Sequence, residues 1–224
     1  MSQNRLMRLF QFIGSQFALE AIGLRRLKIS RLDRLNDPFE MLAGTQSDPM
    51  TRHAMRTLRD TLARHLGLLC FSRDWHNPVM WGHYAEGHRG LCLGFDVDDR
   101  TAMPVEYVAR RLPFDHYLAP EMSEEEVRAL AARFASTKYS HWRYEKEVRC
   151  WASLDPNGPD LQFFNLGKQI RLREVYIGFQ SPISRQMVAK TLGRDMEDRV
   201  KVNNTRLAFR TFRVVTQRDK RLWR

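Results

Sequence analysis

Short runs typical of β-strands alternate irregularly with helix signals along the whole chain. Strands are expected at residues 9–13, 27–30, 68–72, 91–97, 105–108, 112–117, 145–152, 161–164, 170–179, 200–202 and 207–215. The strands 105–108 and 112–117 are expected to pair with each other. Helices are expected at residues 15–25, 49–67, 78–87, 123–136 and 182–192. Because the helices are unevenly spaced and no regular βαβ repeat is present, the pattern favours an α+β domain with a split, mixed or antiparallel sheet and flanking helices.

The length of 224 residues, of which 43% are hydrophobic, suits a single domain with a full core, spanning residues 1–224. No apolar run approaches the ~18 residues of a membrane helix, and the residues from Met1 to Arg5 lack the apolar stretch of a signal peptide. The three cysteines have no CxxC spacing, so they are expected to be reduced core residues. The chain is therefore expected to be cytoplasmic, with no membrane partner.

The formal net charge of +11 comes mostly from arginine, whose planar guanidinium suits phosphate and carboxylate groups. This charge favours a nucleic acid or another polyanion as partner. Outside the C-terminal tail at 218–224, however, the basic residues are spread along the chain and do not alternate with aromatic residues. The charge alone therefore supports a nucleic-acid partner only weakly.

Two glutamates sit two residues apart where the pattern between Trp142 and Arg149 turns from helix to strand. In a strand, Glu145, Glu147 and Arg149 would share one face, with roughly 6.5–7 Å between successive positions. Residues 148, 150 and 152 are apolar and would point the other way. Such a polar face is either part of a catalytic cleft or an edge strand carrying a Glu147–Arg149 ion pair, and the segment alone does not decide between them.

A second group of candidates surrounds the strand that ends at Ser72 and the helix that follows it. On that helix Met80 and Trp81 are expected to pack in the core, whereas His83 and Tyr84 carry polar tips that packing does not need. Residues 36–40, Asn-Asp-Pro-Phe-Glu, are expected to form a turn. The sequence contains neither HExxH histidine spacing nor a Walker or GxGxxG loop, so no metal site and no phosphate-cradling loop is expected.

Four segments in order resemble the uncharacterised bacterial family known as domain of unknown function 2971. They are Leu-Asn-Asp-Pro-Phe-Glu at 35–40, Cys-Phe-Ser at 70–72, the region 80–95 with Met-Trp-Gly-His-Tyr-Ala and Gly-Leu-Cys-Leu-Gly-Phe, and the Glu-x-Glu segment at 142–149. The resemblance spans roughly residues 9–215. It implies an association with abortive-infection and phage-defence systems, and thus a toxic effector that a regulatory partner protein could restrain.

The order of these segments is also similar to that of the ADP-ribosyltransferase superfamily. Those enzymes carry a basic or histidine residue on the first strand, a serine on a middle strand and Glu or Glu-x-Glu on a later strand. Here the corresponding candidates are Arg8 or Gln11, then Ser72, then Glu145 and Glu147. The match departs on the first strand, where Phe-Gln-Phe at 10–12 replaces an aromatic-basic-aromatic pattern.

This resemblance implies NAD as the substrate and assigns roles to the candidates. Cleavage of the nicotinamide–ribose bond develops positive charge on the sugar, which Glu147 would stabilise while Glu145 orients the acceptor. His83 and Ser72 complete the expected catalytic set. The expected NAD-binding residues are Arg8, Gln11, Asn36, Ser72, Tyr84 and Arg149.

The leading hypothesis is therefore a defence-associated effector that transfers ADP-ribose from NAD to a macromolecule, with nucleic acid one candidate target, and that needs no metal. One alternative is a nuclease in which Asp37, Glu40, Glu145 and Glu147 gather a divalent metal. Another is a non-catalytic sensor of a ligand or nucleic acid. The expected orientation of Lys146, away from both glutamates, disfavours the nuclease.

Overall fold

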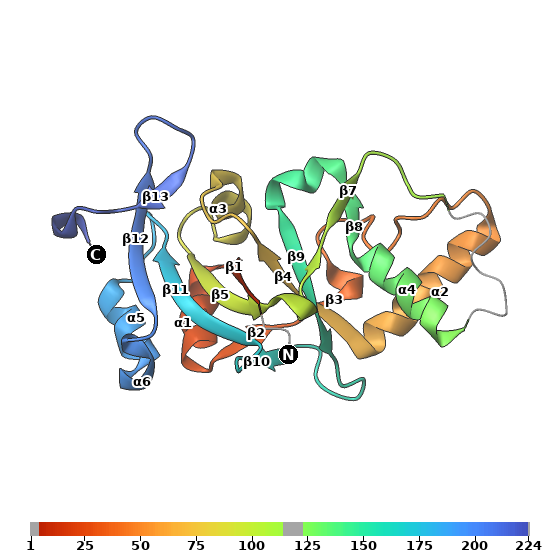
Figure 1. Cartoon of the computed structure of the whole chain (residues 1–224), viewed down its shortest axis with the longest axis horizontal. Coiled ribbons are helices and arrows are strands. Elements are labelled where there is room, and N and C mark those ends of the chain that lie inside the picture. Colours follow the sequence, from red (N-terminus) through yellow and green to blue (C-terminus); the bar gives the residue numbers. More distant parts are fainter. Residues whose placement is uncertain (1–4, 114–122, 224) are drawn as a thin grey trace.

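A computed structural model of the chain describes residues 5–113 and 123–223 (Figure 1). The strands are β1 (Leu6–Ile13), β2 (Arg26–Lys28), β3 (Ser30–Arg31), β4 (Leu66–Ser72), β5 (Leu91–Asp98), β6 (Met103–Pro104), β7 (Glu106–Val108), β8 (Thr137–Tyr139), β9 (Glu147–Ser153), β10 (Phe163–Asn165), β11 (Ile170–Ile177), β12 (Lys201–Leu207) and β13 (Val214–Thr216). The α-helices are α1 (Ser15–Gly23), α2 (Pro49–His65), α3 (Pro78–Tyr84), α4 (Glu124–Ala135), α5 (Arg185–Leu192) and α6 (Arg194–Glu197). The 3₁₀ helices include η1 (Leu32–Arg34) and η3 (Ser140–Glu145).

Nine of the described strands form one curled, mixed sheet in the order β13-β12-β11-β5-β1-β4-β9-β6, with β3 beside β4. Strands β11 and β12 are parallel, whereas the other pairs of this sheet are antiparallel. The first strand thus lies in the centre, between β5 and β4. The structure is an α+β domain, as the sequence predicted.

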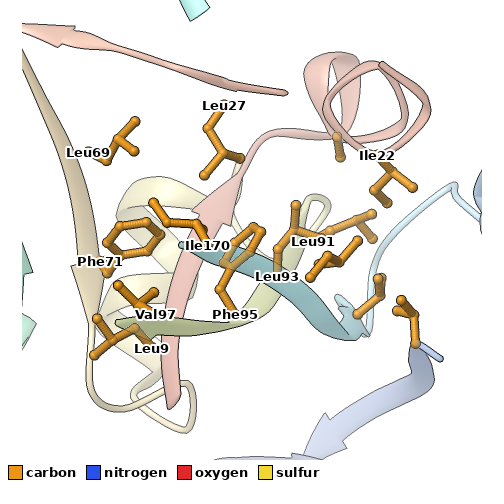
Figure 2. Close-up of a cluster of buried hydrophobic side chains, with 14 of the residues drawn as sticks. Leu9, Ile22, Leu27, Leu69, Phe71, Leu91, Leu93, Phe95, Val97 and Ile170 are labelled. Atoms are coloured by element: carbon orange, nitrogen blue, oxygen red, sulfur yellow. The ribbon is translucent and has the colours of Figure 1, made fainter. Parts of the chain in front are cut away.

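The main core lies on the sheet face covered by α1 and α5. Alternate residues of β5, such as Leu91, Leu93 and Phe95, point into it together with Leu9 and Phe71 from the neighbouring strands (Figure 2). This alternation is the period-two pattern of strands with one buried face. The apolar side of β9, formed by residues 148, 150 and 152, also belongs to this core, as expected.

Two smaller clusters cover the rest of the sheet. Helix α3 packs through the fully buried Trp81 against aromatic residues of β1, including Phe12 at a centroid distance of 5.4 Å. Helices α2 and α4 lie at the far end of the molecule (Figure 1), where Met55 and Phe134 are buried beside β4. Met80 and Trp81 are core residues, as the sequence indicated.

Local signals placed most elements well. Asp48 caps α2, and Ser123 with Glu126 forms the capping box of α4. The expected pairing of 105–108 with 112–117 is wrong in the described part, because β7 pairs with β8 in parallel and Leu112 forms only a bridge to Gly44. Residues 114–117 of that expected strand lie outside the described residues, as do Met1 to Asn4.

No helix among the described residues is long and apolar enough to cross a membrane. The three cysteines are free thiols.

Candidate functional site

Strands β1, β4 and β9 lie side by side, and their register aligns three positions across the sheet. Phe10 pairs with Ser72, and Ser72 pairs with Glu147. Next to this row lies a cavity of about 270 Å³. Its lining includes Phe10, Gln11, Phe12, Ser30, Arg34, Leu35, Asn36, Glu40, Cys70, Phe71, Ser72, Met80, Tyr84, Lys138, Glu145 and Glu147. Segments that are distant in the sequence therefore meet around one pocket.

The pocket adjoins a charge cluster made of Glu40, Lys138, Glu145, Glu147 and Arg149, of which the first four line it. The Lys138 Nζ contacts all three carboxylates, at 3.1 Å from Glu40, 2.6 Å from Glu145 and 3.2 Å from Glu147. Lys138 is 4% exposed and the carboxylates are hardly more accessible. The lysine therefore holds three acidic side chains from three different segments together.

Arg149 forms the second centre of the charge cluster and is completely buried. It binds Glu147 with two parallel hydrogen bonds of 2.8 Å each, from Nε and from a terminal nitrogen. Its other nitrogen contacts Glu40 at 2.7 Å and donates to the Ala135 carbonyl at 2.7 Å. This planar fork is the geometry that arginine uses for carboxylates. The Glu147–Arg149 ion pair, one of the two alternatives left open by the sequence, therefore exists, but it is buried and does not lie at a solvated edge.

Glu145 reaches the charge cluster from outside the strand, contrary to the sequence prediction. It ends η3, and Lys146 then adopts a left-handed conformation with φ 46° and ψ 47° before β9 begins. The Ser72 hydroxyl donates to the Glu145 carbonyl at 2.6 Å, which ties this bend to β4. Because of the bend, both glutamate side chains meet Lys138, while Lys146 points outward to Asp74 at 2.9 Å.

The two glutamates have opposite pKa shifts. Burial alone would raise the pKa of Glu147, but the charge and hydrogen bonds of Arg149, with help from Lys138, lower it to about 2. Burial raises the pKa of Glu145 above its usual value, although Lys138 and a hydrogen bond from Tyr84 oppose this. Glu147 is therefore ionised at neutral pH, and of these two glutamates Glu145 takes a proton more readily.

Hydrogen bonds and charges from neighbouring groups maintain these protonation states. The Tyr84 hydroxyl donates to Glu145 at 2.5 Å and accepts a hydrogen bond from Asn36. Burial and the adjacent Glu145 carboxylate raise the pKa of Tyr84, so it remains a donor. Burial lowers the pKa of Lys138, but the three carboxylates more than offset this and keep it charged.

Compared with apolar side chains of similar volume, a buried cluster of this kind adds little stability, because removing five charges from water costs several kcal/mol per ion before their attraction is counted. With every member ionised, the cluster holds one more carboxylate than cation. Perturbed titratable groups that line a pocket make it a candidate functional site, and structural ion-pair networks perturb pKa values as well. The arrangement sets a carboxylate of raised pKa beside an ionised one, the kind of pair that can divide proton transfer and charge stabilisation between its members.

The structure brings several of the expected site residues to this pocket. Ser72, Tyr84, Glu145 and Glu147 line it, together with Gln11 and Asn36. The Ser72 hydroxyl is engaged by backbone groups, donating to Glu145 and accepting from the Asp74 amide at 3.1 Å, so it positions the site. Arg149 lies behind the lining and acts through the carboxylates it binds.

Two expected site residues lie elsewhere. Arg8 is absent from the pocket lining, because its guanidinium pairs with Asp96 at 2.8 Å and Glu174 at 2.7 Å. His83 is exposed and also absent from the lining, with its ring 6.1 Å from that of Tyr84. Neither assignment is kept.

Three charged pocket residues, Lys138, Glu40 and Arg34, were missing from the catalytic and NAD-binding residues expected from the sequence. Lys138 sits on a three-residue strand with no local signal, and Glu40 appeared only among the metal ligands of the nuclease hypothesis. Arg34 follows the short strand β3 and is 59% exposed beside the pocket, paired with Asp160 at 2.9 Å. The sequence signal for Arg34 was its position two residues before Asn36, which was an expected NAD-binding residue.

Glu40, Glu145 and Glu147 lie close together, as the nuclease hypothesis requires. These carboxylates, however, are paired with Lys138 and Arg149. Asp37 accepts from the Phe39 amide at 2.9 Å and is not part of the pocket lining. In the described part of the chain, no group of three or more histidine, cysteine or acidic side chains has an arrangement that could hold a metal ion.

Comparison with known proteins gives one match, to a family model described as protein of unknown function (DUF2971). Residues 80–150 match that family. The matched span begins in α3 and ends in β9, so it includes Tyr84 and four-fifths of the charge cluster, but neither Glu40 nor Ser72. No curated protein and no solved structure matches the chain.

Proposed function

We propose that the pocket binds the nicotinamide end of NAD and that the protein transfers ADP-ribose to a macromolecular acceptor, with hydrolysis of NAD when no acceptor is present. The observation that carries this proposal is the pair Glu145 and Glu147, which share Lys138 while their pKa values move in opposite directions. Environments that split a carboxylate pair in this way assign one group to charge stabilisation and the other to proton transfer.

The chemistry needs these two roles. As the bond between ribose C1′ and the nicotinamide nitrogen breaks, its electron pair leaves with nicotinamide and positive charge develops on the sugar. Glu147, held ionised, stabilises that charge from a site that excludes most water. Glu145 accepts the proton of the acceptor hydroxyl or amine as the new bond to C1′ forms.

The separation of the two carboxylates does not exceed that of pairs that act on one glycosidic bond. The contacting oxygens of Glu145 and Glu147 can be no further apart than their two distances to the Lys138 Nζ combined, 2.6 and 3.2 Å. Carboxyl pairs that act on a single glycosidic bond lie roughly 5–10 Å apart. The spacing is therefore short enough for joint action.

The pocket also has the right size and lining for one end of the dinucleotide. Its 270 Å³ is below the roughly 300–1,000 Å³ of pockets that enclose a whole drug-sized ligand. We assign the nicotinamide ring to the aromatic wall formed by Phe10, Phe12 and Tyr84, and the diphosphate to the exposed Arg34. Arg34 thus replaces Arg8 as the phosphate-binding cation.

An NAD-consuming activity of this kind fits a cytoplasmic defence effector, the role implied by the family resemblance. A toxic activity would have to be inhibited in an uninfected cell, and a regulatory partner protein would supply that inhibition.

Release of free nicotinamide from NAD by the purified chain tests the proposal. We expect release that persists in excess chelator, because the carboxylates are held by Lys138 and Arg149. Arg34→Gln should raise KM for NAD by about tenfold with little change in kcat, since it removes uniform binding of the diphosphate. Arg25→Gln is the matched control, because Arg25 is a similarly exposed arginine that pairs with Asp195.

Two results would overturn the proposal. One is the absence of both NAD binding and NAD consumption at millimolar NAD. The other is chelator-sensitive cleavage of nucleic acid without consumption of NAD, which would identify a nuclease.

A further inference from the structure

The loop that joins β12 to β13 carries two phenyl rings that are almost fully exposed. Phe209 is 90% exposed and Phe212 is 97% exposed. The loop projects beyond the edge of the sheet, away from the body of the molecule (Figure 1). Rings in such positions contribute nothing to the core, and two of them on one projecting loop form a patch of the kind that contacts another molecule.

The loop is surrounded by positive charge. Arg206 stacks its guanidinium on one face of the Phe209 ring at 4.3 Å, and Arg210 and Arg213 are exposed on either side of Phe212. From Lys201 to Trp223 the chain has seven basic residues and one acidic residue. Residues 206–213 read Arg-Leu-Ala-Phe-Arg-Thr-Phe-Arg, so arginine and phenylalanine alternate in this loop. The sequence-based statement that basic and aromatic residues do not alternate outside residues 218–224 is therefore wrong for this segment.

Beside the loop lies a hollow of about 590 Å³ with an aromatic wall. Loop residues form one side, and Pro78, His88 and Phe179 form the other. The rings of His88 and Phe179 lie 4.9 Å apart, and burial lowers the pKa of His88, which keeps the imidazole neutral. The surface is thus concave and aromatic, with arginines at its rim.

We propose that the β12–β13 loop and this hollow bind single-stranded nucleic acid. Unpaired bases stack on exposed aromatic rings regardless of sequence, and arginines along the same groove hold the phosphates. The free face of Phe209, opposite Arg206, and both faces of Phe212 are available for such stacking. The concave hollow beside the rings suits an inserted base. Binding to an anionic lipid surface in place of nucleic acid is an outcome that the binding assays separate.

This surface is connected to the NAD pocket through α3. Pro78, the first residue of that helix, lines the hollow, while Met80 and Tyr84 further along it line the pocket. The segment before α3 is also fastened to β13, because His76 Nδ1 lies 2.7 Å from the Val214 carbonyl oxygen. A bound strand would therefore lie next to the helix that positions Tyr84. The use of a bound strand as the acceptor of ADP-ribose rests on the proposed function, but binding of the strand does not.

Binding of fluorescein-labelled 15-mers of deoxythymidine and of uridine to the full chain, without NAD, tests the inference by fluorescence anisotropy. The double variant Phe209→Ala with Phe212→Ala should raise Kd by at least about tenfold. Its melting temperature should not change, because both rings are solvated. Arg210→Gln with Arg213→Gln should reduce the slope of log Kd against log salt by about 1.4, or 0.7 for each lost phosphate contact.

Matched controls are Phe17→Ala, a ring 58% exposed on α1, and Arg128→Gln on α4, whose side chain is 81% exposed. Neither should change oligonucleotide binding. The inference is overturned if the double phenylalanine variant binds the oligonucleotides as the unaltered chain does, or if a blunt duplex binds as tightly as a single strand. It is also overturned if the loop variant loses only self-association or only binding to anionic vesicles.

Because NAD is absent from these assays, failure of the proposed function would leave their outcome unchanged.

Discussion

Replacing Glu147 by glutamine should destabilise the protein far more than the same replacement of Glu145, although the two residues are almost neighbours. Both side chains are buried and both bind Lys138. The difference comes from their electrostatic surroundings. Glu147 is paired with Arg149 and stays ionised, whereas burial penalises the charge of Glu145.

The magnitude follows from the pKa of Glu147. A folded-state pKa of about 2, against about 4.3 in an unfolded chain, corresponds to about 3 kcal/mol of stability at pH 7. Because the folded pKa is the lower one, this contribution is complete above about pH 5 and is lost as the pH falls from roughly 4.3 towards 2. Tyr84 and Lys138 donate to different oxygens of Glu145, so Glu145→Gln keeps an acceptor for only one of them. The loss of one hydrogen bond should cost about 1 kcal/mol, well below the loss for Glu147→Gln.

Urea unfolding followed by circular dichroism at pH 7 and pH 3 measures these differences. At pH 7 the unfolding free energy of Glu147→Gln should lie about 3 kcal/mol below that of the unaltered chain, and the gap should shrink at pH 3. The reasoning fails if both variants lose the same stability, or if the gap for Glu147→Gln is independent of pH.

Two further predictions concern the surroundings of the pair. Lys146 adopts φ 46°, so Lys146→Val should lower the free energy of unfolding by roughly 1–2 kcal/mol, whereas Lys146→Gly should not. Thermal melts measure the difference. Equal melting temperatures for the two variants would contradict this prediction. Tyr84→Phe removes a hydrogen bond that favours the ionised form of Glu145, so the rise of ADP-ribosyl transfer with pH should move to higher pH, and a pH profile that stays in place would count against Glu145 as the proton acceptor.

Elements governed by short-range physics could be predicted from the sequence. The capping box of Ser123 and Glu126 and the aspartate cap of α2 each depend on residues within one helical turn. The apolar side of β9 follows from side chains alternating across a strand. The same periodicity wrongly extended the strand back to Glu145, because nothing in the sequence shows that Lys146 adopts a left-handed conformation.

The charge cluster depends on contacts between distant segments and could be predicted only in part. The Glu-x-Glu pattern identified the two carboxylates, but Lys138 and Glu40 reach them only because β8 and the loop before α2 fold over β9. Arg8 illustrates the converse. It lies on the expected strand, yet Asp96 and Glu174 on neighbouring strands bind its guanidinium. Such pairings depend on strand order and register, which the local sequence does not encode.

The most direct test of the central claim is the rate of nicotinamide release from NAD by Glu147→Gln and Glu145→Gln, measured at a temperature where circular dichroism shows both variants folded. If Glu147 carries the fixed charge, its replacement should lower the release rate by on the order of a hundredfold or more. Glu145→Gln should retain most of the release and lose transfer to the acceptor. Release by Glu147→Gln at the rate of the unaltered chain would contradict the account.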